Sequence, residues 1–123
     1  MVTPMETEKE FNFSGWILFN PGTQIRIFSS AYIDSIEVDG MKHGGSGGKP
    51  GPMYTLSPDE KMVAVSGRND SSVLYGLQFH TNRTITVFQG SFGGKDFYIN
   101  NNEDTIRIGI YHDGTLVEKV CVR

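Results

Sequence analysis

The stretch T-I-R-I-G-I, residues 105–110, decides the fold class. Its isoleucines occupy every second position, so in an extended chain they point to one face while Thr105 and Arg107 point to the other. This is the pattern of a half-buried β-strand. The same period of two recurs at residues 24–27, 62–65 and 84–87, and in the last of these we expect Ile85 and Val87 to point inward.

Working outward from this stretch, short apolar runs alternate with turn residues along the whole chain. Glycine is unusually frequent, with 15 of 123 residues, and the glycines stand between the runs as turn signals. No window shows a convincing helical period. The pattern predicts an all-β fold with antiparallel pairing and about ten short strands, at residues 16–19, 24–27, 33–38, 53–56, 62–65, 73–80, 84–87, 96–99, 105–110 and 116–122.

Length and charge narrow the class of protein. A chain of 123 residues fits one domain, which we place at residues 11–123 behind a flexible lead-in at residues 1–10. The net charge of −3 and the scattered Lys and Arg residues argue against nucleic acid as a partner. No apolar run approaches the roughly 18 residues of a membrane span, so we expect no membrane insertion. The first fifteen residues lack a signal-peptide pattern, which predicts a soluble protein, cytoplasmic unless the chain is a truncated form of a secreted one.

The glycine-rich stretch at residues 41–52, MKHGGSGGKPGP, invites comparison with phosphate-binding loops. The P-loop pattern needs a glycine where this chain has His43 and a hydroxyl residue where it has Pro50. The prolines at positions 50 and 52 also prevent a helix from starting here. We therefore interpret the stretch as a long hairpin loop.

Four fragments resemble the jacalin-related lectins in order and spacing: Y-I-D-S-I-E-V at 32–38, H-G-G-S-G-G at 43–48, L-S-P-D-E-K-M-V-A-V-S-G at 56–67 and L-Q-F-H-T-N at 77–82. The resemblance extends over about residues 15–122. It implies a β-prism I fold, in which three four-stranded antiparallel sheets surround a pseudo-threefold axis. On this reading Pro58 and Glu60 are structural residues that open a strand, and Gly67 ends it.

The resemblance also implies a carbohydrate site in the loop before the last strand. The family pattern G-x-x-x-D corresponds here to residues 114–118, so that Gly114 begins the loop, the amides of Thr115 and Leu116 donate to the sugar and Glu118 stands where the family has aspartate. Glutamate is longer by one methylene, ~1.5 Å. Alternation along the strand would aim Glu118 at the core, so it must lie at the strand mouth or at a bulge.

Two further elements complete the implied site. The glycine turn before the first long strand corresponds to Ser14 and Gly15, with one glycine where the family often has two. The loop between residues 67 and 76 offers Asn69, Asp70 and Tyr75 as weaker candidates. Galactose-binding members carry a free amino terminus made by cleavage, whereas this chain continues upstream of Gly15, so the analogy favours mannose- or glucose-type glycans, with galactose as the alternative.

Catalysis is not expected, and neither is a metal or another cofactor. His43, His80 and His112 lack the spacing of metal ligands, and the neighbouring carboxylates Asp59 and Glu60 would diverge. A module that kept the prism and lost its sugar site remains the alternative function. Because one shallow sugar site binds weakly, with a dissociation constant of roughly 1 mM, we expect a homo-oligomer or a multidomain parent protein.

Overall fold

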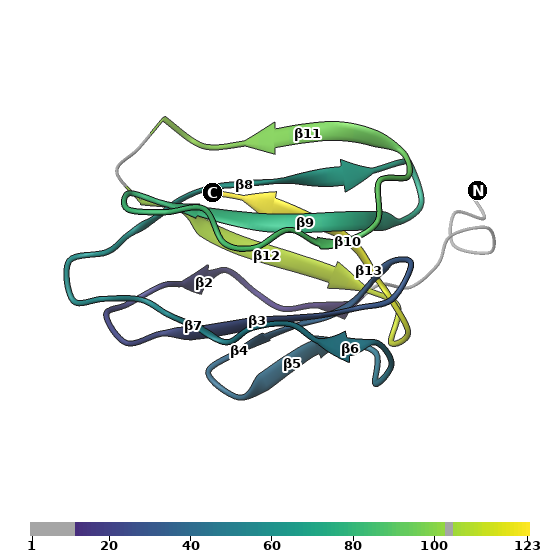
Figure 1. Ribbon diagram of the computed structural model, residues 1–123, viewed down its shortest axis with the longest axis horizontal. Coiled ribbons are helices and arrows are strands. Elements are labelled where there is room, and N and C mark those ends of the chain that lie inside the picture. The colour runs from purple at the N-terminus through teal and green to yellow at the C-terminus, as the bar shows by residue number, and fades with distance from the viewer. Residues whose placement is uncertain (1–11, 103–104) are drawn as a thin grey trace, which may run out of the picture.

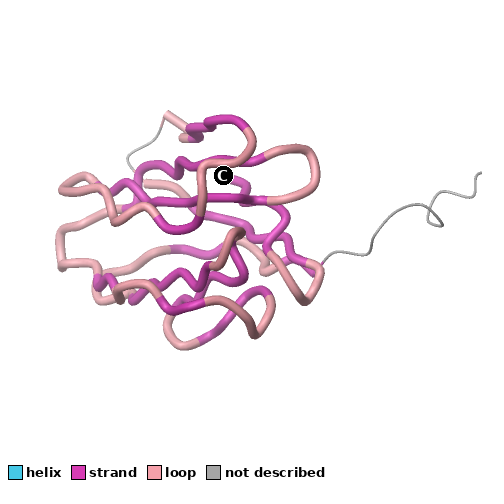
Figure 2. Tube along the Cα trace, turned by 45° about the vertical axis from the view of Figure 1, so that its right-hand side comes forward, coloured by secondary structure: helices cyan, strands magenta, loops and turns pink. Residues whose placement is uncertain are grey.

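The computed structural model describes residues 12–102 and 105–123, and these consist of strands and loops without a helix (Figures 1 and 2). The lead-in expected at residues 1–10 lies outside the described residues. Within the described ranges, accordingly, no helix is long and apolar enough to cross a membrane.

The strands form three antiparallel sheets, which confirms the predicted prism. Sheet A contains β1 (Asn12–Phe13), β2 (Ile17–Leu18), β12 (Arg107–His112) and β13 (Val117–Val122). Sheet B contains β3 (Gln24–Ser29), β4 (Ile33–Val38), β5 (Met41–Gly44), β6 (Lys49–Pro50) and β7 (Tyr54–Thr55). Sheet C contains β8 (Met62–Asn69), β9 (Leu74–Thr81), β10 (Gln89–Gly90) and β11 (Lys95–Ile99).

Sheet B has five strands where four were expected, because two short strands, β6 and β7, both pair with β3. Sheet A shows the same arrangement, since β1 and β2 both pair with β12. In each case two short strands together occupy the edge of the sheet that one longer strand would otherwise occupy.

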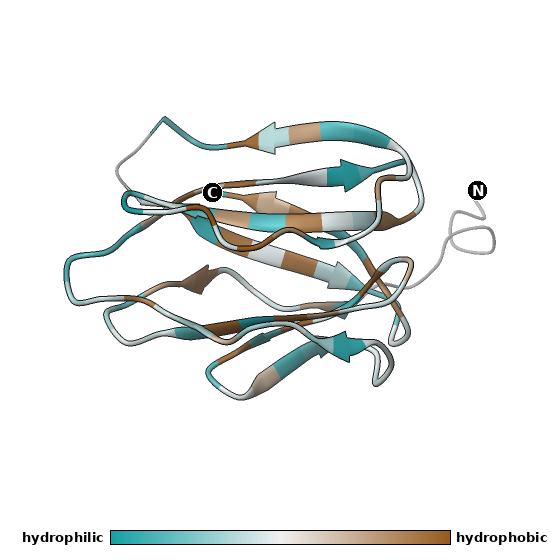
Figure 3. Ribbon diagram, in the orientation of Figure 1, coloured by the Kyte–Doolittle hydropathy of each residue, from teal (hydrophilic) through white to brown (hydrophobic). Residues whose placement is uncertain are grey.

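The core lies between the three sheets, and the strand at residues 105–110 behaves as predicted. Ile106, Ile108 and Ile110 are all fully buried, whereas Arg107 is exposed, and hydrophobic and hydrophilic bands alternate along β12 in Figure 3. Sheets B and C add the other large buried side chains, among them Ile33, Ile36, Leu74, Leu77 and Phe79. At roughly 1.5–3 kcal/mol for each fully buried aliphatic side chain, this shared core holds the sheets together.

Glu60 anchors the chain as it enters β8. Its buried carboxylate accepts hydrogen bonds from the Ser57 amide (3.0 Å), the Thr81 hydroxyl (2.5 Å) and the Tyr54 hydroxyl. Burial alone would raise the pKa of Glu60, but these hydrogen bonds stabilise the charged form and lower the pKa. The neighbouring Asp59 is exposed and pairs with Arg83, so the two carboxylates diverge.

Three sequence expectations were wrong in detail. Residues 84–87 form no strand, and the side chains of Ile85 and Val87 are 55% and 63% exposed. The ladder is interrupted because the Phe79 amide donates its hydrogen bond to the Thr86 hydroxyl (2.9 Å), where a regular strand would offer a backbone carbonyl. The stretch at residues 41–52 is not all loop, since it contains β5 and β6. Gly67 does not end β8; it lies inside the strand, where a side chain would collide with the Gly76 carbonyl oxygen, 2.1 Å from the added Cβ.

Candidate functional site

The hairpin turns β3–β4, β8–β9 and β12–β13 lie at one end of the prism, on the right in Figure 1. In each hairpin the ladder shifts by one residue just after the turn, so that the second strand carries one extra residue, as in a β-bulge. The extra residues are Asp34 in sheet B, Tyr75 in sheet C and Glu118 in sheet A. These three positions are therefore structurally equivalent.

The sheet A hairpin carries the site residues that the sequence predicted. Glu118 lies at a bulge, since His112 pairs with Val117 and Tyr111 with Lys119, as alternation required. The amides of Thr115 and Leu116 both donate to Asp113 Oδ1, each at 2.9 Å. A sugar that used these amides would have to share them with Asp113, and their role in binding stays a prediction.

The turn at Ser14 and Gly15 lies beside this hairpin. The Ser14 amide donates to the Ile110 carbonyl oxygen (3.0 Å), and the Ser14 hydroxyl oxygen accepts the Ile110 amide hydrogen bond (2.9 Å). Gly15 has a φ of 80°, but a Cβ there would meet nothing within 4 Å. The positive φ of Gly15 is needed for the turn. Its backbone does not pack closely against another residue, unlike the glycines beside the hairpins of sheets B and C.

The sheet B hairpin places a carboxylate against a glycine loop. Asp34 is 7% exposed, and its Oδ1 accepts a hydrogen bond from the Ser30 hydroxyl (2.9 Å). A Cβ added to Gly48 would lie 2.7 Å from Oδ1, and one added to Gly47 would lie 3.0 Å from Oδ2, so only glycine allows this backbone to pack so closely. Within the described part of the chain, Oδ2 accepts no hydrogen bond and the amides of Gly47 and Gly48 donate none. One carboxylate acceptor and two amide donors are thus available side by side.

The sheet C hairpin has the same construction with an aromatic ring in place of the carboxylate. Tyr75 packs against Gly93 and Gly94, where an added Cβ would lie 2.6 and 3.0 Å from ring carbons. Its hydroxyl donates to Asp70 Oδ2 (2.8 Å), while Asp70 Oδ1 accepts the amides of Ser72 and Val73. The backbone hydrogen bond from Ser72 and the hydroxyl of Tyr75 lower the pKa of Asp70. Asp70 therefore acts as a turn-stabilising group.

The weaker candidate Asn69 lies at the end of β8, opposite Leu74. Its carbonyl oxygen would lie 2.3 Å from a Cβ added to Gly94, so its backbone closes the glycine turn of sheet C. Of the predicted residues, the structure thus brings Gly114, Thr115, Leu116 and Glu118 into one hairpin end of sheet A. It places Asn69, Asp70 and Tyr75 in another hairpin end, that of sheet C.

The sheet A and sheet B sites touch each other. A Cβ on Gly45 would lie 2.1 Å from the Thr115 carbonyl oxygen, so the glycine loop packs directly on the β12–β13 turn. Burial lowers the pKa of His43, and the nearby His112 lowers it further. His112 Nδ1 in turn accepts the Gly114 amide hydrogen bond (3.1 Å).

Asp34 is the functional candidate that the sequence prediction missed. The stretch S-A-Y-I-D at residues 30–34 resembles the G-T-L-V-E stretch at 114–118 in having an acidic residue four positions after a small one. That spacing was the available signal. The apolar pattern of residues 33–38 obscures it, because in one regular strand Asp34 has no special place.

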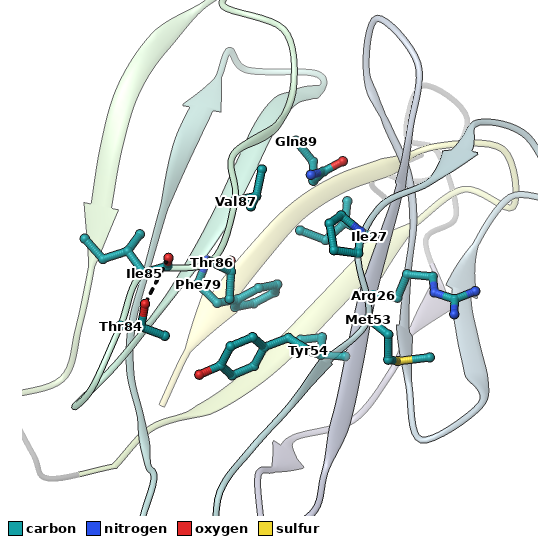
Figure 4. A pocket seen from close by; sticks show the side chains of 12 residues that line it. Arg26, Ile27, Met53, Tyr54, Phe79, Thr84, Ile85, Thr86, Val87 and Gln89 are labelled. Carbon is teal, nitrogen blue, oxygen red and sulfur yellow. Dashed lines mark hydrogen bonds between the residues drawn. The ribbon is translucent and has the colours of Figure 1, made fainter.

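An apolar cavity of about 260 Å³ lies away from these turns, between sheets B and C (Figure 4). The segment at residues 84–87 forms one wall, and Ile27, Met53 and Tyr54 lie opposite, with Phe79 at the base. Carboxylates are absent from its lining, so it lacks a charged acceptor of the kind that Asp34 offers. In the described ranges no group of three or more His, Cys, Asp or Glu side chains is arranged to hold a metal ion.

Comparison with known proteins agrees with this architecture. The family model of the jacalin-like lectin domain matches residues 6–119. The chain belongs to the jacalin-like lectin domain family. Jacalin-like lectins are carbohydrate-binding proteins, and the three sheets and the paired glycine and hairpin loops are this chain's version of that domain.

Individual relatives match this jacalin-like chain either over part of its length or at low sequence identity. Griffithsin from Griffithsia sp. is 39% identical over 54 residues, which is 44% of this chain and 45% of griffithsin, so the match spans less than half of either protein. A galactose-specific lectin from Artocarpus hirsuta, solved with methyl-α-D-galactose, superposes with a TM-score of 0.72 at 20% identity, covering 93% of this chain and 97% of the other. A mannose-binding lectin from Champedak gives a TM-score of 0.68 at 21% identity, covering 97% and 98%. At 20% and 21% identity, the two solved structures show only that the fold is shared.

Proposed function

We propose that this jacalin-like domain binds mannose- or glucose-type glycans without chemically changing them, and that its principal site is the Asp34 end of sheet B. The observation that carries the proposal is the carboxylate of Asp34 beside the amides of Gly47 and Gly48. Sugar hydroxyls both donate and accept hydrogen bonds, so a carboxylate and backbone amides together satisfy two neighbouring hydroxyls.

The Glu118 end of sheet A is the second, weaker site in this proposal. It has the longer carboxylate, and its turn amides are engaged by Asp113. Gly15 makes no close contact of the kind that Gly47 and Gly48 make with Asp34. Binding here requires a sugar to share the Thr115 and Leu116 amides, which lowers the net gain from each hydrogen bond.

The choice of mannose or glucose over galactose rests on the sheet A site, where the backbone is continuous at Gly15, and we extend it to the equivalent Asp34 end of sheet B. Ser14 and Gly15 are joined within a hydrogen-bonded turn, so no free ammonium group stands at this position to contact a sugar. The solved relatives include a galactose-specific and a mannose-binding lectin, so the shared fold alone does not select the sugar.

A shallow site of this kind binds one hexose weakly, with a dissociation constant of roughly 1 mM. Useful affinity then comes from presenting several sites together. We therefore propose that the domain works as a homo-oligomer or as one part of a larger protein. Analytical ultracentrifugation of the full chain distinguishes these two arrangements.

The test is a titration of the ¹⁵N-labelled domain with methyl α-mannoside, methyl α-glucoside and methyl α-galactoside, followed by amide chemical shifts. The proposal expects saturable shifts that are largest at Gly47 and Gly48, smaller at Thr115 and Leu116, and weakest with galactoside. The alternative, a prism that has become a protein-interaction module, is favoured by the engaged amides of sheet A. It predicts no shifts at millimolar sugar, and that result would overturn the lectin proposal.

A further inference from the structure

Tyr75 occupies the position in sheet C at which the equivalent hairpins carry Asp34 and Glu118. We infer that Tyr75 and Tyr32 together form an aromatic subsite next to Asp34, which takes the second pyranose ring of a bound oligosaccharide. The inference rests on the proposed function, because it requires a first hexose at Asp34. It adds the ligand class: an oligosaccharide of two or more units in place of a single hexose.

Ser91 joins the two hairpin ends into one surface. Its amide donates to the Tyr75 carbonyl oxygen (3.0 Å), and its hydroxyl donates to the Ala31 carbonyl oxygen (2.7 Å). Ala31 directly precedes Tyr32, in the turn that leads to Asp34. The rings of Tyr32 and Tyr75 lie with their centroids 5.3 Å apart and their planes at 43°. The two Ser91 hydrogen bonds thus join the backbone of Tyr75 to the turn that carries Tyr32, two residues before Asp34.

The Tyr75 ring is held in place before any ligand arrives. Asp70 accepts its hydroxyl hydrogen bond, and the backbone of Gly93 lies so close that a Cβ there would stand 2.6 Å from the ring. Tyr32, in contrast, keeps 37% of its surface exposed. An exposed ring supported by a fixed one offers contact area at little cost in conformational entropy.

The chemistry of this pair suits the part of a sugar that a carboxylate does not recognise. A pyranose has hydroxyl groups at its edge and C–H groups on its faces. The carboxylate and amides at Asp34 suit the hydroxyl edge, whereas a tyrosine ring offers an apolar face with a polar tip. A glycosidically linked second ring lying over the tyrosines adds an apolar contact that a monosaccharide cannot make.

The test compares calorimetric affinities for methyl α-mannoside and for α1→2-, α1→3- and α1→6-linked methyl mannobiosides. For the wild-type chain we expect the best disaccharide to bind about tenfold more tightly than the monosaccharide, the size of effect that one aromatic contact provides. Tyr75→Ala should bring this affinity ratio close to one. Tyr75→Phe is the matched control: it keeps the ring, loses the hydroxyl and should retain the ratio.

Each other outcome counts against the inference. A wild-type ratio near one, with clear monosaccharide binding, overturns the subsite and leaves the proposed function standing. Failure of the wild type to bind either sugar overturns both. A folded Tyr75→Ala with an unchanged ratio removes the ring from recognition. A Tyr75→Phe that loses the ratio overturns the apolar ring contact, since it assigns the effect to the hydroxyl group and its hydrogen bond to Asp70. If Tyr75→Ala does not fold, Tyr32→Ala is measured in its place, with the same ratio as the deciding number.

Discussion

Asp34 and Glu118 are the extra residues of equivalent β-bulges in two sheets of the prism, and they differ in what surrounds them. Asp34 is buried against Gly47 and Gly48, whose amides make no hydrogen bond within the described ranges. The turn amides beside Glu118 donate to Asp113. The pseudo-threefold symmetry thus places a carboxylate at equivalent positions in sheets A and B. At the Asp34 position the neighbouring backbone amides remain available to donate to a ligand.

The first prediction separates these two copies. Asp34→Asn keeps the shape of the side chain and removes the charged acceptor. A hydrogen bond to a charged group contributes about 1.5–3 kcal/mol, so affinity for methyl α-mannoside should fall roughly 10- to 150-fold. Glu118→Gln, the matched change in sheet A, should reduce affinity much less. Calorimetry on both variants decides the matter, and a larger loss for Glu118→Gln would return the principal site to sheet A.

Comparing Asp34 with Glu118 shows which features of the site can be predicted from the sequence. The isoleucines at residues 105–110 predict their strand correctly because alternation and burial coincide along its whole length. Residues 33–36 are all buried, since the bulge at Asp34 turns two successive side chains inward. A bulge has no consistent signature in a single sequence, so the position of Asp34 relative to Gly47 becomes visible only when the ladder is known.

The second prediction concerns the close approach at Gly48. This residue has a φ of 82°, and a Cβ would lie 2.7 Å from Asp34 Oδ1 and 2.9 Å from the Ser29 amide nitrogen. Gly48→Ala should therefore abolish sugar binding and lower the free energy of unfolding by more than the backbone strain alone, which is about 1–2 kcal/mol. Gly22→Ala is the control, since Gly22 has a φ of 83° with nothing within 4 Å. Equal destabilisation of the two variants in urea would show that the contact with Asp34 is unimportant.

Residues 84–87 show a second limit of sequence patterns. The T-I-T-V alternation is that of a strand, but a strand also needs a neighbour that accepts and donates along its length. Here the Thr86 hydroxyl takes the Phe79 amide, and the Thr81 amide donates to the Thr84 carbonyl oxygen (2.8 Å) in a tight turn. Competition between a side-chain hydroxyl and a backbone carbonyl for one amide is decided by tertiary geometry, which the local pattern does not contain.

The third prediction tests whether Glu60 is structural. Glu60→Ala leaves two hydroxyls and the Ser57 amide without their carboxylate acceptor in a buried position, so it should lower the free energy of unfolding by about 3–5 kcal/mol. Asp59→Ala, one residue away, removes an exposed pair with Arg83 and should cost no more than about 1 kcal/mol. Urea denaturation of both variants measures the difference. Sugar affinity of folded Glu60→Ala should equal that of the wild type, because the hydrogen-bond partners of Glu60 are Tyr54, Ser57 and Thr81, none of which belongs to the turn at Asp34.

The fourth prediction is a loss of stability in mild acid. Burial lowers the pKa of His43, with a further contribution from His112, and burial also lowers the pKa of His80, whose Nε2 lies 2.6 Å from the Ser66 hydroxyl oxygen. Because both pKa values lie below the unfolded value of 6.5, the unfolded chain takes up protons first as the pH falls. The free energy of unfolding should be constant above that pH and decrease as the pH passes through it toward the folded pKa values. Urea melts between pH 8 and pH 5 measure this slope, and the double variant His43→Gln/His80→Gln should flatten it. An unchanged slope in that variant would assign the acid sensitivity to other groups.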